Sequence, residues 1–357
     1  MRFISVNDLK EGMIIGKPFY GQTGYLLIQS GLALTAPVIA KLKYLGYMGL
    51  YIEDAFSEGL DIENVISPET RSKAGKSVRK LMTAAAKKKA VLFSEAVKDV
   101  LEVLNQVIDE ITGSGSVIIN IIDMKGYDAY TYQHSINVCV LSCVIGMGFD
   151  LNRDQLYKLA LSAMLHDLGN LFIDKEILDK PGKLTADEYE VIKTHTAIGV
   201  DQLKLRYFFP SSVIAPIIQH HERFDGGGYP FGRKGAEIPL NAQIISISDI
   251  YDAFTSNRPY RKAHPVTEAY EYILGNAGQA FGAELVKSFT KKIAPFPLGV
   301  QVLLSNGRKG IVFKHHEDNL IRPLIKLEPT PEQPDECFID LNNDVESYHI
   351  TVEKVLI

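Results

Sequence analysis

Apolar positions recur with helical spacing through the middle of the chain. From Phe93 to Ile111 they return at intervals of three and four, which is the spacing of one helix face. The same spacing predicts further helices over 129–147, 153–166, 185–205, 211–220, 241–254 and 266–274. Residues 113–292 are therefore predicted to form a helical domain.

The first 65 residues have a mixed pattern. Short apolar runs at 13–15, 25–28 and 49–52 have the length of strands, and turn residues bound them. One stretch, 36–45, has helical spacing instead. Residues 1–65 are therefore predicted to form a small α/β module, for which we expect a sensory or regulatory role.

The end of the chain, after Pro295 and Pro297, is again rich in short strand-like runs. These runs occur at 299–305, 310–314, 324–327 and 337–341. The first two flank Asn306-Gly307, a dipeptide typical of a hairpin turn. Residues 293–357 are therefore predicted to form a small β-rich domain.

A helix is predicted to connect the first module to the helical domain. Ser67 is a residue type that caps helix N-termini, and Pro68 suits the first turn. Only Gly75 interrupts the helical sequence from there to Ile111, so residues 66–112 are predicted to be one connecting helix. It either packs on the next domain or acts as a signalling helix through which a homodimer forms. The predicted fold class is multidomain and mainly α.

Composition and charge are those of a globular protein. The chain has 357 residues, 46% of them apolar, and its 38 basic and 43 acidic residues give a net charge of −5. Without a basic excess, binding to polymeric nucleic acid is not expected. Three cysteines are too few for a disulfide framework and indicate a reducing compartment. No apolar run approaches the ~18 residues of a membrane span, and early charges break any signal-peptide core, so we expect a cytoplasmic protein without membrane contact.

The candidate chemistry lies in the predicted helical domain, where five of the six histidines are candidates. The five are His134, His166, His195, His220 and His221. His166 and Asp167 follow an apolar stretch that ends at Leu165, and Asp249 lies within another, where an unpaired carboxylate would be costly. Adjacent histidines on a continued helix point ~100° apart. His220 and His221 can therefore reach one ion only if the helix ends there, which the glycines at 226–228 favour.

Imidazole and carboxylate groups together suit divalent iron, manganese or zinc. Taken alone, His134 on an apolar helix would be typical of a buried core histidine, and His166-Asp167 is a weak signal. Their joint occurrence favours a metal site, and the candidates outnumber the ligands of one four-coordinate ion. Two ions ~3.5–4 Å apart can clamp a phosphate for in-line attack. The pattern therefore predicts a two-metal site that acts on a phosphate group.

Several short motifs follow one another in this domain. They are Tyr130-Thr-Tyr-Gln-His-Ser135, His166-Asp-Leu-Gly169, His195, His220-His-Glu-Arg223, Gly228-Tyr-Pro230 and Asp249-Ile-Tyr-Asp-Ala253. In order and spacing they resemble the HD-GYP phosphodiesterases, a branch of the HD-domain phosphohydrolases. The resemblance implies an all-α HD-type catalytic domain over residues 113–292. It also implies hydrolysis of cyclic di-GMP, a bacterial second messenger, to pGpG or GMP.

The resemblance implies a set of metal ligands. One divalent ion would be held by His134, His166, Asp167 and Asp249, and the second by His195, His220 and His221. Asp167 would bridge the two ions, with iron or manganese as the expected metals. His166 and Asp167 would be the catalytic residues.

The resemblance also implies substrate contacts. Arg258 and Arg261 match positions that contact phosphate, a role that suits the two-pronged guanidinium group. Asn170 and Tyr229 are further expected substrate contacts. The Gly228-Tyr229-Pro230 loop either shapes the site or contacts a protein partner.

The chain departs from the family pattern at two positions. Where some members carry a glutamate that supports a third metal, this chain has Tyr130, which predicts two ions. Where the pattern has a lysine that contacts phosphate, this chain has Asn170, which predicts lower catalytic efficiency.

Two alternatives to a cyclic di-GMP phosphodiesterase stay open. One is a sensor that binds cyclic di-GMP and turns it over slowly or not at all, which Asn170 favours. The other is hydrolysis of another nucleotide, such as a hybrid cyclic dinucleotide or a nucleoside triphosphate. The Gly228-Tyr229-Pro230 loop argues against the triphosphate.

Overall fold

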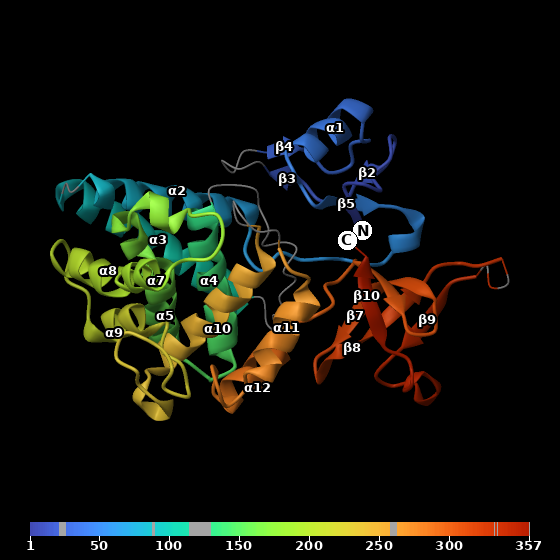
Figure 1. Ribbon diagram of the computed structural model, residues 1–357. Helices are drawn as coiled ribbons and strands as arrows, with labels where there is room; N and C mark the ends of the chain where they lie inside the picture. The colour runs from blue at the N-terminus through green and yellow to red at the C-terminus, as the bar shows by residue number, and fades with distance from the viewer. Residues whose placement is uncertain are drawn as a thin grey trace. The chain divides into compact units, whose positions relative to one another are not determined.

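The computed structural model describes residues 1–20, 26–87, 90–113, 130–257, 263–331, 333 and 335–356, with the backbone alone at residues 90, 130 and 131. The described residues divide into two compact units (Figure 1). The first unit contains those of 1–64 and 293–357, and the second contains those from 65 to 292. Both ends of the chain therefore belong to the same unit.

The N-terminal part of the first unit is a small α/β arrangement. Strands β1 (Arg2–Ser5), β5 (Gly49–Glu53) and β2 (Ile14–Ile15) form an antiparallel sheet with β5 in the middle. Strands β3 (Phe19–Tyr20) and β4 (Leu26–Ile28) form a separate pair. Helix α1 (Ala36–Tyr44) contributes Ile39 and Leu42 to the core of this part. The α/β module predicted at the N-terminus is confirmed.

The C-terminal part of the first unit is a five-stranded antiparallel sheet with the order β10-β6-β7-β8-β9. Its strands are β6 (Gln301–Leu304), β7 (Lys309–His316), β8 (Asn319–Leu327), β9 (Cys337–Asp340) and β10 (Val352–Leu356). The turn between β6 and β7 contains Asn306-Gly307, and Gly307 has a φ of +80°, which glycine adopts without strain. The predicted hairpin and the β-rich character of this segment are confirmed.

One hydrophobic core joins the two parts of the first unit. Phe3 and Ile62 belong to the same cluster of buried side chains as Val300 and Ile311. The Phe3 N–H also donates to the Gly299 carbonyl at 2.9 Å. The segments that the sequence presents as two separate ends therefore bury their apolar surface together.

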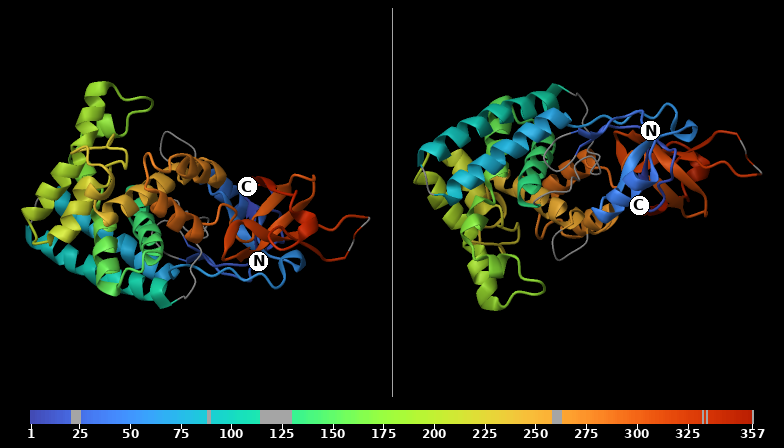
Figure 2. Two further views of the ribbon diagram at one scale, coloured as in Figure 1. Left: turned by 90° about the horizontal axis from the view of Figure 1, so that it is seen from below. Right: turned by 90° about the horizontal axis from the view of Figure 1, so that it is seen from above.

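The second unit is helical (Figure 2). Its helices are α2 (Pro68–Ala86), α3 (Ala90–Gly113), α4 (Tyr130–Met147), α5 (Arg153–Leu165), α6 (Lys175–Leu178), α7 (Ala186–Lys193), α8 (His195–Lys204), α9 (Ser211–Gln219), α10 (Leu240–Thr255), α11 (Val266–Gly275) and α12 (Ala283–Lys292), with a 3₁₀ helix η3 (Leu168–Phe172) between α5 and α6. Helix α4 is central, because α2, α3, α5, α10 and α12 all pack against it. The mainly α fold class is confirmed. None of the helices in the described ranges is both long and apolar enough to cross a membrane.

The segment predicted as one connecting helix contains two helices. Helix α2 ends at Ala86 and α3 begins at Ala90, and the two lie side by side (Figure 2). Folding back buries Leu81 of α2 and Leu104 of α3, apolar surface that one straight helix would leave in water. The helix predicted over 185–205 is also two helices, α7 and α8, which meet at Thr194.

The predicted start of α2 is confirmed. The Ser67 hydroxyl accepts a hydrogen bond from the Thr70 N–H at 3.2 Å, and Pro68 is the first residue of the helix. The carboxylate of Glu110, from α3, accepts hydrogen bonds from the Ser67 N–H and the Thr70 hydroxyl, both at 2.6 Å. The end of α3 therefore fixes the first turn of α2.

Candidate metal centre

Helix ends present the two adjacent pairs of candidate ligands. Helix α5 ends directly before His166 and Asp167, and α9 ends directly before His220 and His221. Where a helix ends, neighbouring side chains are released from the ~100° separation that a continued helix imposes, so both can face one point. The helix end predicted at His220 from the sequence is confirmed.

His195 reaches the same point because two glycines let its helix approach closely. It is the first residue of α8, which packs against η3. A Cβ atom at Gly169 would lie 1.8 Å from the His195 carbonyl oxygen, and one at Gly199 would lie 3.0 Å from the Gly169 nitrogen. Only a glycine at position 169 permits this approach. The glycine of the His166–Gly169 motif therefore has a structural role.

Asp167 lies between two groups of histidines, and each of its carboxylate oxygens faces one group. Oδ1 is 3.4 Å from Nε2 of His195 and 4.0 Å from Nε2 of His220. Oδ2 is 3.5 Å from Nε2 of His166 and 3.6 Å from Nε2 of His134. This is the arrangement of a carboxylate that could bridge two cations.

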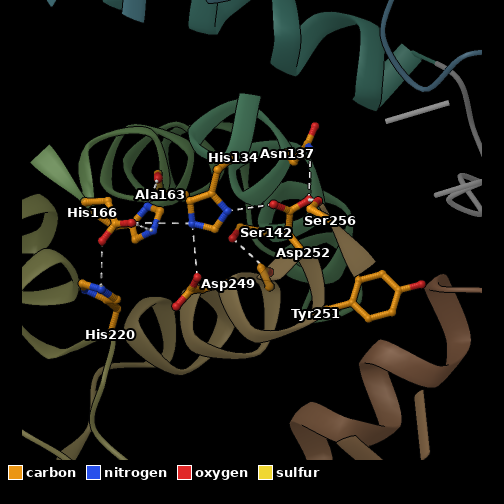
Figure 3. Close-up of polar contacts among 12 residues, drawn as sticks. His134, Asn137, Ser142, Ala163, His166, His220, Asp249, Tyr251, Asp252 and Ser256 are labelled. Carbon is orange, nitrogen blue, oxygen red and sulfur yellow. Dashed lines mark hydrogen bonds and ion pairs between the residues drawn. The ribbon is translucent and has the colours of Figure 1, made fainter. Parts of the chain in front are cut away.

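Asp249 of α10 and His221 extend these two groups. Oδ1 of Asp249 is 3.2 Å from Nε2 of His134, and the His221 ring centroid is 4.1 Å from that of His220. Figure 3 shows His134 in contact with both Asp249 and Asp252. Three overlapping sets of ligand atoms each lie within 4.8 Å of one another: Asp167, His195, His220 and His221; His134, His166 and Asp167; and His166, His220 and Asp249.

Three of these histidines share one protonation pattern. In each, Nδ1 donates to the carbonyl three residues earlier at 2.7 Å: His166 to Ala163, His195 to Ile192, and His220 to Ile217. A carbonyl can only accept, so Nδ1 carries the hydrogen, and Nε2 of the neutral ring carries a lone pair. A metal-ligating histidine has the same arrangement, with its second nitrogen hydrogen-bonded to a carbonyl or carboxylate.

The lone pairs face one another with no hydrogen between them. Nε2 of His195 is 3.5 Å from Nε2 of His220, and Nε2 of His166 is buried without a hydrogen-bond partner. A buried acceptor without a partner costs ~1–3 kcal/mol. A cation at the centre of the cluster would relieve both the repulsion and this cost. The donor set therefore fits a divalent metal ion.

The electrostatics of the cluster give its groups the charge states that ligate metal. Burial lowers the pKa of His220 well below its ordinary value and lowers the pKa of His221 to about 4, so both rings are neutral at pH 7. Burial alone would raise the pKa of Asp249, but the adjoining His134 and the other nearby imidazoles bring it well below its ordinary value. Neutral imidazole and ionised carboxylate are the forms that bind a metal.

Tyr229 closes one side of the cluster. Its ring stacks on that of His221, with centroids 4.7 Å apart and planes at 25°. The loop that carries it is held by the buried carboxylate of Glu222, which accepts hydrogen bonds from the Phe231 N–H at 2.7 Å and the Arg233 N–H at 3.0 Å. A Cβ atom at Gly228 would lie 2.3 Å from the Arg223 nitrogen. Gly228 and Glu222 therefore set the position of Tyr229.

The structure brings together all seven residues that the sequence analysis named as metal ligands. Asn170 lies in η3, where its N–H donates to the Asp167 carbonyl at 3.0 Å. Arg258 and Arg261 lie outside the described residues, as does the side chain of Tyr130.

Asp252 supports His134, a role that was not predicted from the sequence. Oδ2 of this buried carboxylate accepts a hydrogen bond from Nδ1 of His134 at 2.7 Å (Figure 3). Asp252 follows Asp249 by three residues, so both lie on one face of α10. Two acidic residues at this spacing in an apolar helix are the sequence signal that identifies the pair.

The segment of the chain that carries the cluster is similar in sequence to known proteins. Residues 116–285 match the family model of the HD domain. The chain is 33% identical over 227 residues to a cyclic di-GMP phosphodiesterase of Pseudomonas aeruginosa, a match that covers 62% of this chain and 55% of that protein. It is 37% identical over 172 residues to a cyclic di-GMP phosphodiesterase of Thermotoga maritima, covering 46% of this chain and 45% of that protein. It is also 37% identical over 162 residues to 3'3'-cGAMP-specific phosphodiesterase 1 of Vibrio cholerae, covering 45% of this chain and 37% of that protein.

These matches extend over about half the length of the relatives or less. The matched family segment begins before His134 and ends after Asp249, so it contains the whole histidine and aspartate cluster. The chain therefore contains a segment, residues 116–285, that matches the HD-domain family.

Proposed function

We propose that the chain is a metal-dependent phosphodiesterase that hydrolyses cyclic di-GMP to pGpG or on to GMP. The position of Asp167 carries the proposal, because its two oxygens face two separate sets of histidine nitrogens. The relatives named as cyclic di-GMP and 3'3'-cGAMP phosphodiesterases support a cyclic dinucleotide as the substrate class.

The proposed ligand sets follow the two oxygens of Asp167. One ion would be held by His134, His166, Asp167 and Asp249, and the other by Asp167, His195, His220 and His221. Iron or manganese suits this mixture of imidazole and carboxylate. When bound, such a pair of ions supplies Lewis acidity at the phosphate oxygens and lowers the pKa of water.

The chain's own residues would position these ligands and the substrate. His166 and Asp167 are the proposed catalytic residues, since Asp167 faces both histidine groups and His166 presents an unpaired Nε2. Burial raises the pKa of Tyr229, so its phenol stays protonated and can donate a hydrogen bond to substrate. Arg258 and Arg261 are proposed as phosphate contacts because they match family positions that contact phosphate.

Two further candidate functions have observations in their favour. Asn170, in place of the family lysine, favours a sensor that binds cyclic di-GMP and turns it over slowly. The similarity to a 3'3'-cGAMP-specific phosphodiesterase favours a hybrid cyclic dinucleotide as substrate.

Product analysis separates these candidates. Purified protein of measured metal content is incubated with cyclic di-GMP or with 3'3'-cGAMP, and the nucleotides are resolved by chromatography. We expect faster conversion of cyclic di-GMP, first to the linear dinucleotide pGpG. Tight binding of cyclic di-GMP without product would favour the sensor, and faster conversion of 3'3'-cGAMP would favour the hybrid substrate.

Replacing Asn170 with lysine should raise kcat/KM for cyclic di-GMP about ten- to hundredfold. Hydrogen bonds to charged groups contribute ~1.5–3 kcal/mol, and a neutral amide supplies only part of this. Steady-state kinetics at matched metal content would measure the effect. The control is Asn170→Gln, which lengthens the side chain without adding charge and should leave kcat/KM within about threefold. A folded, metal-loaded Asn170→Lys enzyme that is no faster would show that position 170 does not limit the rate.

A further inference from the structure

A series of hydrogen bonds leads from α2 to the cluster of histidine and aspartate side chains. Nη1 of Arg71 donates to Oδ1 of Asn137 at 2.9 Å, and Nδ2 of Asn137 donates to Oδ1 of Asp252 at 2.9 Å. Oδ2 of Asp252 then accepts from Nδ1 of His134 at 2.7 Å. Figure 3 shows the last two of these contacts. This series of hydrogen bonds therefore ends at the imidazole ring of His134, whose Nε2 faces Asp167 and Asp249.

The Arg71 end of this series determines how Asn137 is oriented. The Asn137 side chain is 3% exposed and lies between a donor and an acceptor. An arginine can only donate, so the amide oxygen must face Arg71 and the amide nitrogen must face the Asp252 carboxylate. If the amide turned over, two donors would meet at one side and two acceptors at the other, which would break both hydrogen bonds.

Asn137 in turn donates a hydrogen bond to Asp252, and Asp252 determines which ring nitrogen of His134 carries the hydrogen. The second oxygen of Asp252 keeps the hydrogen of His134 on Nδ1, which leaves the lone pair of Nε2 for the cluster. Ser256 also donates to Oδ1 of Asp252, at 3.2 Å. The buried carboxylate therefore accepts from His134, Asn137 and Ser256, and Asn137 links it to the Arg71 guanidinium of α2.

We propose that Arg71 is a positioning residue for the metal site, which acts through Asn137 and Asp252 on His134. The proposal rests on the proposed function, since it needs His134 to bind a metal. Arg71 precedes the matched family segment, which begins at residue 116. The first turn of α2, which carries Arg71, is fixed to α3 through Glu110, so the guanidinium is delivered from a rigid position. Outer-shell partners of this kind change metal affinity by about 10- to 100-fold.

The test measures metal affinity, with no need for turnover. The full chain is stripped of metal and titrated with Mn²⁺, and free Mn²⁺ is followed by electron paramagnetic resonance. In Arg71→Met, which keeps the length of the side chain and removes its donors, one of the two dissociation constants should rise about tenfold. The other should stay within about twofold of the wild-type value. Arg71→Lys, which restores a donor and the charge, should return the first constant to within about threefold.

The control is Lys73→Met, which removes an exposed cation from the same helix and should change neither constant. Thermal unfolding monitored by circular dichroism confirms that each variant is folded. If Arg71→Met does not fold, Arg71→Leu, which also removes every donor at this position, is titrated in its place, and unchanged constants there overturn the inference. Equal affinities in wild type and Arg71→Met also overturn it. Wild-type protein that binds no Mn²⁺ would overturn the proposed function and this inference together.

Discussion

Replacing Asp167 with alanine is expected to reduce the proposed hydrolysis of cyclic di-GMP by at least about a thousandfold and to lower metal content in the same preparation. The reason is geometric, because this one carboxylate faces the histidines of both groups. Bound metal contributes several kcal/mol of transition-state stabilisation, which corresponds to about three orders of magnitude in rate. Chromatography of products and elemental analysis of the same sample would measure both effects.

The control for this variant is Asp201→Ala, an exposed aspartate on α8 outside the cluster. It should keep both the activity and the metal content of the wild type. Full activity in Asp167→Ala would show that the reaction takes place elsewhere in the chain. Loss of activity with unchanged metal content would show that Asp167 does not hold the ions.

Replacing Gly169 with alanine should destabilise the second unit by about 3 kcal/mol, the upper part of the usual range for overpacking. A Cβ atom there would lie 1.8 Å from the His195 carbonyl oxygen, so α8 would have to move away from η3. That movement would also carry His195 away from Asp167. Urea unfolding and a Mn²⁺ titration would measure the two effects.

Gly275→Ala is the matched control, because a Cβ atom at that glycine, at the end of α11, would have no described atom within 4 Å apart from its own neighbours and helix backbone. It should leave stability within about 1 kcal/mol of the wild type. If Gly169→Ala were as stable as Gly275→Ala and bound Mn²⁺ as tightly as the wild type, the close crossing of α8 and η3 would not shape the site.

Local patterns predicted the elements that carry the candidate site. The apolar stretch before His166 and the glycines after His221 indicated two helix ends, and α5 and α9 end where they were expected. Helix ends depend on a few neighbouring residues, so sequence reports them well. The ligand residues were also within reach of sequence reasoning, because histidines and aspartates at the ends of buried helices need a partner.

Features that depend on contacts between distant segments were not predictable in this way. The turn between α2 and α3 falls within a sequence that favours helix throughout, and the apolar faces that meet across it decide the fold. The core shared by Phe3 and Val300 joins residues almost 300 positions apart, by the numbering of the chain. No sequence motif distinguishes Arg71 from other helical arginines, and its proposed positioning role is visible only from its hydrogen bond to Asn137.

The most direct test of the two-ion site is anomalous X-ray scattering from crystals of the protein grown with Mn²⁺. We expect two anomalous peaks about 3.5–4 Å apart, one on each side of the Asp167 carboxylate. The first should lie beside Nε2 of His134 and His166, and the second beside Nε2 of His195 and His220. A single peak, three peaks, or two peaks that do not share Asp167 would contradict the account.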